Sequence, residues 1–377
     1  MSSVTGKNPQ VIILALMLLA STITAQDSWE IYRGDPQLSG RSDSKIASSY
    51  QLAWTYVADD KIKSSPVISD SLVYIASIDG HLQAVNLHTG QLKWVFTSEY
   101  GIEAPPLVLE DQVLVGSLEG RLFAVDKMTG SLNWDFLSEG QIIGSVNYIV
   151  KESDDAGLVF FGSYDNYLYC LEARTGKLRW RYQTTHFING TPATNGKTIF
   201  FGGCDGILHF LDIATGEERN AVNLNYYIAG SPSLIGDRLF IGHYGGLFFC
   251  IDIAGNIIWQ HGDPDKSAPI VASPAVDETR VIYGSRDFRV YCLNRNTGRS
   301  IWTFDTQGNI DGSAVIGNGK VVFGSGDGYL YIINLLDGTL IWSTDLCTPI
   351  ISSPAVTDDY LVVSSQAGVV YSFRNNE

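Results

Sequence analysis

Seven tryptophans divide this sequence into segments of nearly constant length. The intervals between them are 40, 40, 46, 79, 43 and 40 residues. The interval of 79 is two repeats, because Gly216 is followed four residues later by Asn220, where the equivalent glycines of other repeats are followed by tryptophan. A period of 40 to 45 residues indicates a repeat architecture, in which each unit buries its apolar face against its neighbours. The markers are Trp54, Trp94, Trp134, Trp180, Trp259, Trp302 and Trp342.

Every repeat has the same internal order, and the first repeat shows it clearly. Ser65-Pro66 precedes a short apolar run, and two β-rich runs at 72–77 and 81–86 flank the pair Asp79-Gly80. Thr89-Gly90 then introduces a last run, at 91–96, which contains the tryptophan. Asp-Gly and similar pairs accept the positive φ angles of tight hairpin turns, so each repeat is predicted to be a four-stranded antiparallel meander. Four strands per unit of this length are typical of propeller blades.

The number of blades follows from the innermost strands. The last repeat provides only three strands, the third at 369–374, and the segment 51–57 around Trp54 provides the missing outer strand. We therefore predict an all-β fold, an eight-bladed β-propeller of four-stranded antiparallel blades over residues 50–377, with the last blade closed by an N-terminal strand. The eight starts are Ser65-Pro66, Pro105-Pro106, Ser145-Val146, Thr191-Pro192, Ser231-Pro232, Ser273-Pro274, Ser313-Ala314 and Ser353-Pro354.

The recurring tryptophans are interpreted as structural. A large ring at one outer-strand position fills the wedge between neighbouring blades, and Asn220 is expected to weaken the one junction where it replaces the ring. A ligand-stacking role would require all the rings on one accessible surface.

The N-terminus and the charge limit where the protein acts. Residues 1–25 are predicted to be a signal peptide, with Lys7 before the apolar run 11–20 and small residues before Gln26, and residues 26–49 form an entry segment. The protein is thus expected to be periplasmic or extracellular, with no transmembrane segment in the mature chain. A net charge of −15 without a basic run argues against nucleic acid as a partner. Five cysteines, three of them in equivalent repeat positions, predict no disulfide framework.

The repeat resembles the pyrroloquinoline quinone (PQQ) propeller repeat, approximately Ala-x-Asp-x-x-Thr-Gly-x-x-x-Trp. Residues 124–134 read Ala-Val-Asp-Lys-Met-Thr-Gly-Ser-Leu-Asn-Trp, and 170–180 and 292–302 follow the same order from a cysteine. The segment 29–34, Trp-Glu-Ile-Tyr-Arg-Gly, is similar to the entry sequence of such proteins. The resemblance covers nearly the whole mature chain and implies the propeller fold.

The resemblance alone leaves two groups of function open. Quinoprotein dehydrogenases of this fold bind PQQ with calcium and carry an adjacent cysteine pair and long insertions, whereas the BamB-like assembly factors of the outer membrane are lean and non-catalytic. This sequence has no adjacent cysteines and only one short expansion, at 151–157, so it is closest in size and blade count to the BamB-like group. It lacks a cysteine directly after the signal, so it is not expected to be an N-terminal-cysteine lipoprotein.

The predicted function is a monomeric, non-enzymatic scaffold or binding module, without a cofactor, for another envelope or extracellular protein. The alternatives are a PQQ-dependent dehydrogenase-like protein with calcium and a carbohydrate- or surface-binding propeller. No catalytic triad, zinc signature or phosphate loop is recognisable, so no catalytic or metal site is predicted. The recurring turn acids such as Asp79 and Asp205 are interpreted as turn formers.

A binding site would lie at the mouth of the central funnel, where the loops enter the innermost strands. One side of this mouth is predicted to be polar and the other apolar, with a charged pair possible among Lys63, Glu103 and Asp311. The alternative interpretation is a solvated, mutually neutralising cluster that lines a water-filled channel. The candidate residues are Lys61, Lys63, Glu103, Gln141, Phe187, Asn189, Tyr227, Asn309 and Asp311.

Overall fold

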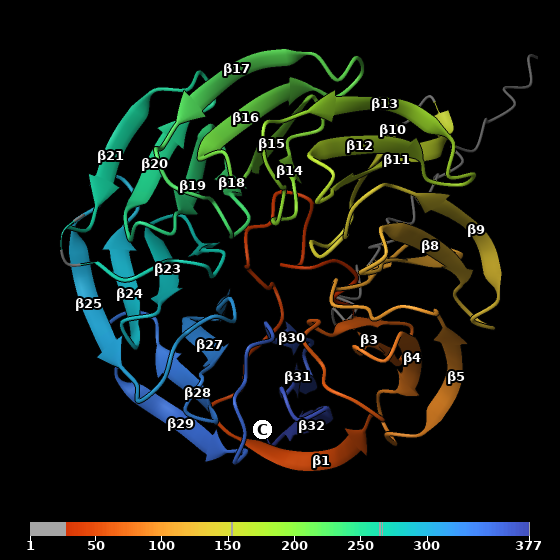
Figure 1. Ribbon diagram of the computed structural model, residues 1–377. Helices are drawn as coiled ribbons and strands as arrows, with labels where there is room; N and C mark the ends of the chain where they lie inside the picture. Colours follow the sequence, from red (N-terminus) through yellow and green to blue (C-terminus); the bar gives the residue numbers. More distant parts are fainter. Residues whose placement is uncertain (1–27, 152–153, 264, 266, 377) are drawn as a thin grey trace, which may run out of the picture.

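A computed structural model describes residues 28–151, 154–263, 265 and 267–376, and it shows eight four-stranded antiparallel sheets arranged as a ring (Figure 1). The described residues contain no helix, and none of their segments forms a helix that could cross a membrane. The predicted eight-bladed propeller is confirmed. The predicted signal peptide lies outside the described residues.

The strands follow each other from the axis to the rim in every blade. Blade 1 consists of β2 (Val67–Ser69), β3 (Leu72–Ala76), β4 (His81–Asn86) and β5 (Leu92–Thr97), and blade 2 of β6 (Leu107–Val108), β7 (Gln112–Gly116), β8 (Arg121–Asp126) and β9 (Leu132–Leu137). Blade 3 consists of β10 (Asn147–Lys151), β11 (Asp154–Gly162), β12 (Tyr167–Glu172) and β13 (Leu178–Gln183), and blade 4 of β14 (Ala193–Thr194), β15 (Thr198–Gly202), β16 (Ile207–Asp212) and β17 (Glu218–Asn223). Blade 5 consists of β18 (Ser233–Ile235), β19 (Arg238–Gly242), β20 (Phe248–Asp252) and β21 (Ile257–His261), and blade 6 of β22 (Ala275–Val276), β23 (Arg280–Ser285), β24 (Arg289–Asn294) and β25 (Ser300–Asp305). Blade 7 consists of β26 (Val315–Gly317), β27 (Lys320–Gly324), β28 (Tyr329–Asn334) and β29 (Leu340–Asp345).

Blade 8 joins the two ends of the chain. It consists of β30 (Ala355–Val356), β31 (Tyr360–Ser364), β32 (Val369–Asn375) and, as its outermost strand, β1 (Tyr50–Val57). The register of β1 against β32 runs from Tyr50 opposite Asn375 to Val57 opposite Val369. The predicted closure by the N-terminal strand is therefore confirmed, and it covers the edge that β32 would otherwise expose.

The tryptophan rings lie at the junctions between blades. Gly90, for example, has a φ of +71°, and a Cβ on it would lie 2.9 Å from the indole of Trp54 in the preceding blade. Only glycine therefore allows this close approach. Five indole Nε1 atoms donate to a carbonyl of the next blade: Trp54 to Leu87, Trp94 to Lys127, Trp180 to Ile213, Trp259 to Arg295 and Trp302 to Leu335.

The innermost strands are joined by a ring of hydroxyl groups, which we call the hydroxyl girdle. In each step a backbone N–H donates to the hydroxyl of the next blade, for example from Ser231 to Ser273 at 2.9 Å. The girdle is interrupted at Pro105, which has neither an N–H nor a hydroxyl. Its members are Ser145, Thr191, Ser231, Ser273, Ser313, Ser353 and Ser65.

The entry segment fills the centre of the ring, a position that the sequence did not indicate. Residues 29–45, which we call the belt, cross the middle of the ring in Figure 1 and pair with the free edges of the innermost strands. Because these edges are otherwise unpaired, the belt satisfies backbone groups that a bare channel would leave to water. Its bonds run through the blades in order: Trp29 with Ile68, Glu30 with Val108, Pro36 with Asn147 and Thr194, Gln37 with Leu234, Ser39 with Val276, Gly40 with Ile316 and Lys45 with Asp358.

The belt carries a buried arginine. Arg33 is 1% exposed, and its Nη2 atom donates to the carbonyl of Pro274 at 2.9 Å. Burial lowers the pKa of Arg33 to about 10, although Tyr32 and Asp35 oppose this effect. Even at that value the guanidinium remains charged at neutral pH, and its Nε and Nη1 atoms are buried without a hydrogen-bond partner among the described residues, so burying this charge costs stability.

The contact between Arg33 and Gly40 predicts a strong steric effect. A Cβ on Gly40, whose φ is +64°, would lie 1.7 Å from the Nη2 atom of Arg33. Gly319 has a φ of +72° but nothing within 4 Å of such a Cβ, so Gly319→Ala controls for backbone strain. We expect Gly40→Ala to lower the free energy of unfolding by about 2 kcal/mol more than Gly319→Ala in urea denaturation. Equal losses would show that the belt is not tightly packed at this point.

Blade 4 contains a histidine held between two carboxylates. In blades 3, 6 and 7 the turn acid accepts a hydrogen bond from a tyrosine four residues later, as Asp327 does from Tyr331 at 3.0 Å. In blade 4 this tyrosine is replaced by His209, whose Nε2 lies 3.1 Å from Asp205 and whose Nδ1 lies 2.7 Å from Glu218. Burial disfavours the imidazolium, but the bonds to both carboxylates outweigh it and raise the pKa of His209.

This raised pKa predicts the pH dependence of stability. The charged form of His209 stabilises the fold fully below the unfolded pKa of 6.5, and this contribution is lost as pH rises through the higher folded pKa. His209→Tyr restores the residue found in other blades and removes this titration. We expect the difference in melting temperature between wild type and His209→Tyr to fall by roughly 2 °C between pH 6 and pH 9. A constant difference over this range would contradict the charged pairing.

Candidate binding surfaces of the ring

The funnel is a blind depression of about 220 Å³ on the face where the loops enter the innermost strands. Its floor includes Tyr32 of the belt, whose hydroxyl lies 3.0 Å from Ser313 Oγ and 3.3 Å from Ser273 Oγ. The belt crosses the axis below this depression, so the funnel does not continue as an open channel through the centre of the ring. What remains open is a shallow polar cup above the hydroxyl girdle.

Two ion pairs lie in the wall of this cup. Lys63 Nζ is 2.6 Å from Glu103 Oε1, so two of the three charged candidates do meet. Asp311 does not join them, because Arg286 binds both of its carboxylate oxygens at 2.8 and 2.9 Å. This bidentate hydrogen bonding raises the pKa of Arg286 and fixes the orientation of the ion pair between Arg286 and Asp311. Each acid in the funnel is thus neutralised by a neighbouring cation.

The structure separates the predicted residues into two groups. Lys63, Glu103, Asn189 and Asp311 line the funnel together. The others lie on the rim outside its lining, where their backbone carbonyls accept a hydrogen bond from a turn of the blade that their loop enters, as Gln141 does from Tyr164 N at 2.9 Å. The rim residues are Lys61, Gln141, Phe187, Tyr227 and Asn309.

Exposed aromatic rings gather on one part of this rim, over blades 3 to 5. Phe187 and Tyr164 stack with centroids 4.7 Å apart and planes only 3° apart. Tyr227 contacts Tyr244 at 5.8 Å, and the guanidinium of Arg286 lies 5.9 Å from the Tyr244 centroid. Exposed fractions of 47% for Phe187 and 56% for Tyr227 show that these rings face solvent. We call Tyr164, Phe187, Tyr226, Tyr227 and Tyr244 the aromatic arc.

Sequence reasoning missed several of these residues. Arg286, Tyr164 and Tyr244 occupy the turn between the second and third strands, at the position that pairs with a rim carbonyl. That position directly precedes Asp165 and Asp287, so reading it around the repeats would have found the two sets of residues together. Tyr32 gave no such signal, because nothing in a non-repeating entry segment indicates that it returns to the axis.

The funnel does not fit calcium-bound PQQ, which the propeller resemblance raises as an alternative. Calcium takes six to eight oxygen ligands. Glu103 and Asp311 are already bound to Lys63 and Arg286, on different sides of the cup. Among the described residues, acidic and histidine ligand atoms converge within 4.8 Å at Asp59, Asp79 and His81, none of which lines the funnel. Asp79 also accepts hydrogen bonds within its own turn, from Ser77 and His81.

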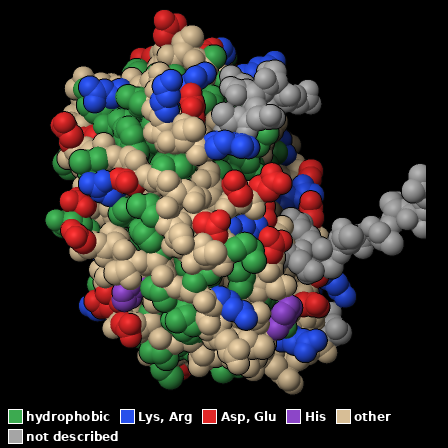
Figure 2. Space-filling model, turned by 90° about the vertical axis from the view of Figure 1, so that its right-hand side faces the viewer, with side chains coloured by type: hydrophobic (Ala, Val, Ile, Leu, Met, Phe, Trp, Pro, Cys, Tyr) green, Lys and Arg blue, Asp and Glu red, His purple; other side chains and the backbone are tan. Residues whose placement is uncertain are grey.

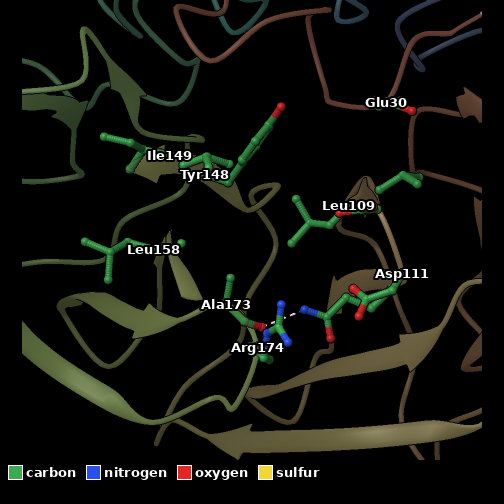
Figure 3. Close-up of a pocket in the computed structure, with 13 residues that line it drawn as sticks. Glu30, Leu109, Asp111, Tyr148, Ile149, Leu158, Ala173 and Arg174 are labelled. Carbon is green, nitrogen blue, oxygen red and sulfur yellow. Dashed lines mark hydrogen bonds between the residues drawn. The ribbon is translucent and has the colours of Figure 1, made fainter. Parts of the chain in front are cut away.

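A second hollow, of about 340 Å³, lies on the opposite face between blades 2 and 3 (Figure 3). Leu109, Tyr148, Ile149 and Leu158 form its walls, and Figure 3 shows Glu30 at one side and Asp111 with Arg174 at another. We call it the blade 2–3 pocket. No feature of the sequence had pointed to a site here, apart from the short expansion of blade 3.

Comparisons with known proteins agree with the architecture. The crystal structure of BamB from Moraxella catarrhalis shares 21% identity with this chain, with a TM-score of 0.71 over 87% of this chain and 98% of that one. The quinohemoprotein alcohol dehydrogenase from Comamonas testosteroni matches with a TM-score of 0.77 and 13% identity, over 92% of this chain and 80% of that one. A europium-containing methanol dehydrogenase also has a TM-score of 0.77, at 12% identity, over 92% and 98%. At these identities the likeness shows the fold alone.

Sequence comparison is more specific than the fold. A search of curated proteins finds no match to this sequence. The family described as "Outer membrane protein assembly factor BamB" matches residues 46–141, 137–285, 221–308 and 286–376, which together span all eight blades. The predicted resemblance is thereby confirmed, and the chain belongs to this BamB family of PQQ-like propellers.

Proposed function

We propose that this protein is an exported, non-catalytic scaffold that binds another protein of the cell envelope through the aromatic arc. The observation that carries this proposal is the exposure of four rings of the arc, at 40% to 56%, on one part of the funnel face. A cluster of solvent-facing aromatic rings is unusual on a monomeric surface and is typical of sites that another molecule covers. Tyrosine and arginine are also the residues that most often dominate protein interfaces.

The rigidity of the surroundings supports a docking role. Phe187 and Tyr227 stand on loops whose carbonyls are tied to the neighbouring turns by hydrogen bonds of 2.8 and 2.9 Å from Cys204 and Tyr244. A preformed surface of this kind loses little conformational entropy when a partner binds. The family of the chain supports the same role, because its name is that of an assembly factor.

The neutralised funnel supports the absence of a redox reaction. Both of its carboxylates are held by cations, so neither is free to coordinate a metal ion or to act as a base without first breaking its pair. Adding PQQ and calcium chloride to the purified protein is expected to leave its melting temperature and quinone absorbance unchanged. A clear shift in either quantity would overturn the non-catalytic role.

The docking role is tested by replacing the arc. We expect a photo-crosslinking residue placed beside Tyr227 to capture one stoichiometric partner from the native envelope. The double variant Phe187→Ala/Tyr227→Ala should reduce this capture at least about tenfold, since interface aromatics commonly contribute 1 to 2 kcal/mol or more each. Leu132→Ala/Leu340→Ala is the matched control, because these outer-strand leucines are exposed to a similar degree, 49% and 53%. Equal capture by both double variants would refute the arc as the docking surface.

A further inference from the structure

The junction between blades 2 and 3 departs from the pattern that five other junctions share. Five tryptophans donate their indole N–H to a carbonyl of the next blade, but Trp134 Nε1 is buried without a partner among the described residues. The equivalent carbonyl, that of Ala173, instead accepts from Gln112 Nε2 at 2.6 Å. The second strand of blade 3, β11, is also nine residues long, whereas β7 and β15 have five. The repeat has thus been altered where it forms the blade 2–3 pocket.

The hydrogen bond from Gln112 to the Ala173 carbonyl, which stands where other junctions have an indole bond, forms part of the pocket wall. The dashed line in Figure 3 marks the hydrogen bond that the Ala173 carbonyl accepts from Gln112, and Leu109 and Ile149 line the same cavity. Because Gln112 is 4% exposed and tied across the two blades, it holds the pocket open as a fixed cavity. A volume of about 340 Å³ is sufficient for one or two side chains of a bound segment.

The walls of the pocket are apolar while its rim is acidic. Leu109 and Ile149 are half-buried and Val150 is 71% exposed, so among the described residues apolar surface faces the cavity. Among the side chains that the structure describes, three carboxylates, those of Glu30, Glu110 and Asp111, line the pocket against the one cation of Arg174. In Figure 2, which views the side of the ring formed by blades 1 to 3, acidic side chains gather near the middle of the surface.

The carboxylate of Glu30 is fixed in place. Its Oε1 accepts a hydrogen bond from Ser69 Oγ at 2.6 Å, and its backbone carbonyl accepts from Val108 N at 2.8 Å. Burial raises the pKa of the Tyr148 hydroxyl in the pocket wall, and the charge of Glu30 raises it further. The field of this carboxylate therefore reaches into the cavity. Within the described residues, neither Glu110 nor Asp111 forms an ion pair.

We propose that the blade 2–3 pocket binds an extended segment of a partner protein in which a lysine or arginine stands next to an aliphatic residue. The aliphatic side chain enters between Leu109 and Ile149, and the cation meets the carboxylates of the rim. Complementary charge selects the basic residue, and removal of apolar surface from water supplies the affinity. The proposal deepens the scaffold function, on which it rests, by adding a second docking site on the face opposite the aromatic arc.

The test uses the full mature chain and synthetic peptides, with labelled methyl groups observed by NMR. The probe is the capped heptapeptide Gly-Ser-Leu-Arg-Leu-Ser-Gly, compared with versions in which arginine is replaced by glutamate or both leucines by serine. We expect the first peptide to shift the methyl signals of Leu109, Ile149, Val150 and Leu158 and both replacements to abolish these shifts. Affinity should also fall as salt is raised, because exposed charges are screened.

Protein variants distinguish an effect of the rim carboxylates from an effect of net charge or of a disturbed fold. Glu110→Lys/Asp111→Lys lies in the β6–β7 turn and should weaken binding roughly fivefold or more. The control Asp237→Lys/Asp359→Lys makes the same charge change in the equivalent turns of blades 5 and 8 and should leave affinity unchanged. Equal loss in both variants would mean that only net charge matters, which overturns the proposal.

Two other results would also overturn it. If the glutamate peptide shifts the same methyl signals equally, the acidic rim does not select the ligand. If ethylammonium alone reproduces the shifts at equal concentration, the pocket binds a small cation rather than a peptide segment. The peptide experiment is independent of envelope capture, so loss of capture in the aromatic-arc variant leaves this result unaffected and the two failures can be distinguished.

Discussion

A chain that begins at Ala58 is expected not to fold into a stable ring. It lacks both the belt, residues 29–45, and the closing strand β1, so the edges of the innermost strands and of β32 lose their backbone partners. The apolar cluster around blade 8 also loses Trp29, Ile46 and Tyr50, each at most 5% exposed. Natural domains have only about 5 to 15 kcal/mol of net stability, so losing all of these contacts exceeds what the fold can tolerate. Circular dichroism and urea denaturation should show no cooperative transition.

The missing segment should restore the fold when it is supplied separately. A fragment of residues 28–57, co-expressed with residues 58–377, contains every strand-edge partner that the truncation removes. We expect it to recover a soluble complex with a cooperative transition. A truncated chain that is as stable as the full chain would show that closure by β1 is not essential.

Trp94→Ala is expected to be the most damaging single substitution among the tryptophan junctions. Trp94 is the most buried of the seven repeat-marking rings, at 9% exposed; it packs against Tyr74 with centroids 5.9 Å apart and donates to the Lys127 carbonyl at 3.1 Å. Truncation of a buried tryptophan typically costs about 3 to 5 kcal/mol, measured here as the loss in free energy of unfolding in urea. Trp94→Phe keeps most of the ring but removes the donor, so it should lose clearly less. Equal losses would assign the effect to the hydrogen bond rather than to packing.

The converse substitution, Asn220→Trp, is expected to stabilise the ring. Asn220 keeps a hydrogen bond to the next blade, from Nδ2 to the Ala254 carbonyl at 2.7 Å, but offers little surface to cover Gly255. Filling such a junction commonly gains about 0.5 to 2 kcal/mol. The turn that faces Asn220 is one residue shorter than the equivalent turn of the other repeats, because Asp252 stands three residues before Gly255. We therefore expect a gain in free energy of unfolding at the lower end of this range. A lower melting temperature would contradict the predicted register of this repeat.

Most of the fold could be predicted because it is repeated. Asp-Gly and Thr-Gly pairs mark the same turns in blade after blade, so an error in one repeat is corrected by its neighbours. The closing strand was predictable by the same logic, since one outer strand was missing at the C-terminus and one was left over around Trp54. Cys170, Cys250 and Cys292 each lie opposite the tryptophan of their own blade, as their equivalent positions in the repeat predicted.

The belt and the partners in the funnel could not be predicted, because neither follows the repeat. Residues 29–45 bind to all eight blades through their own backbone groups, and in six blades the partner is also a backbone group. Bonds between backbone groups leave no pattern of side chains. Asp311 was expected near Lys63, but its partner Arg286 comes from a turn 25 residues earlier in the chain. Which of two cations a carboxylate meets depends on loop geometry, which residue spacing does not specify.

The gap in the hydroxyl girdle gives the ring one sector that differs from the rest. Pro105 belongs to blade 2, so neither the step from blade 1 nor the step to blade 3 is joined by a serine or threonine hydroxyl, while the steps from blade 3 through blade 8 to blade 1 are continuous. At the step from blade 2 to blade 3 the bond from Gln112 Nε2 to the Ala173 carbonyl takes the place of the missing hydroxyl bridge, although it lies farther from the axis. One buried amide therefore joins the two blades and fixes the wall of the blade 2–3 pocket at the same time.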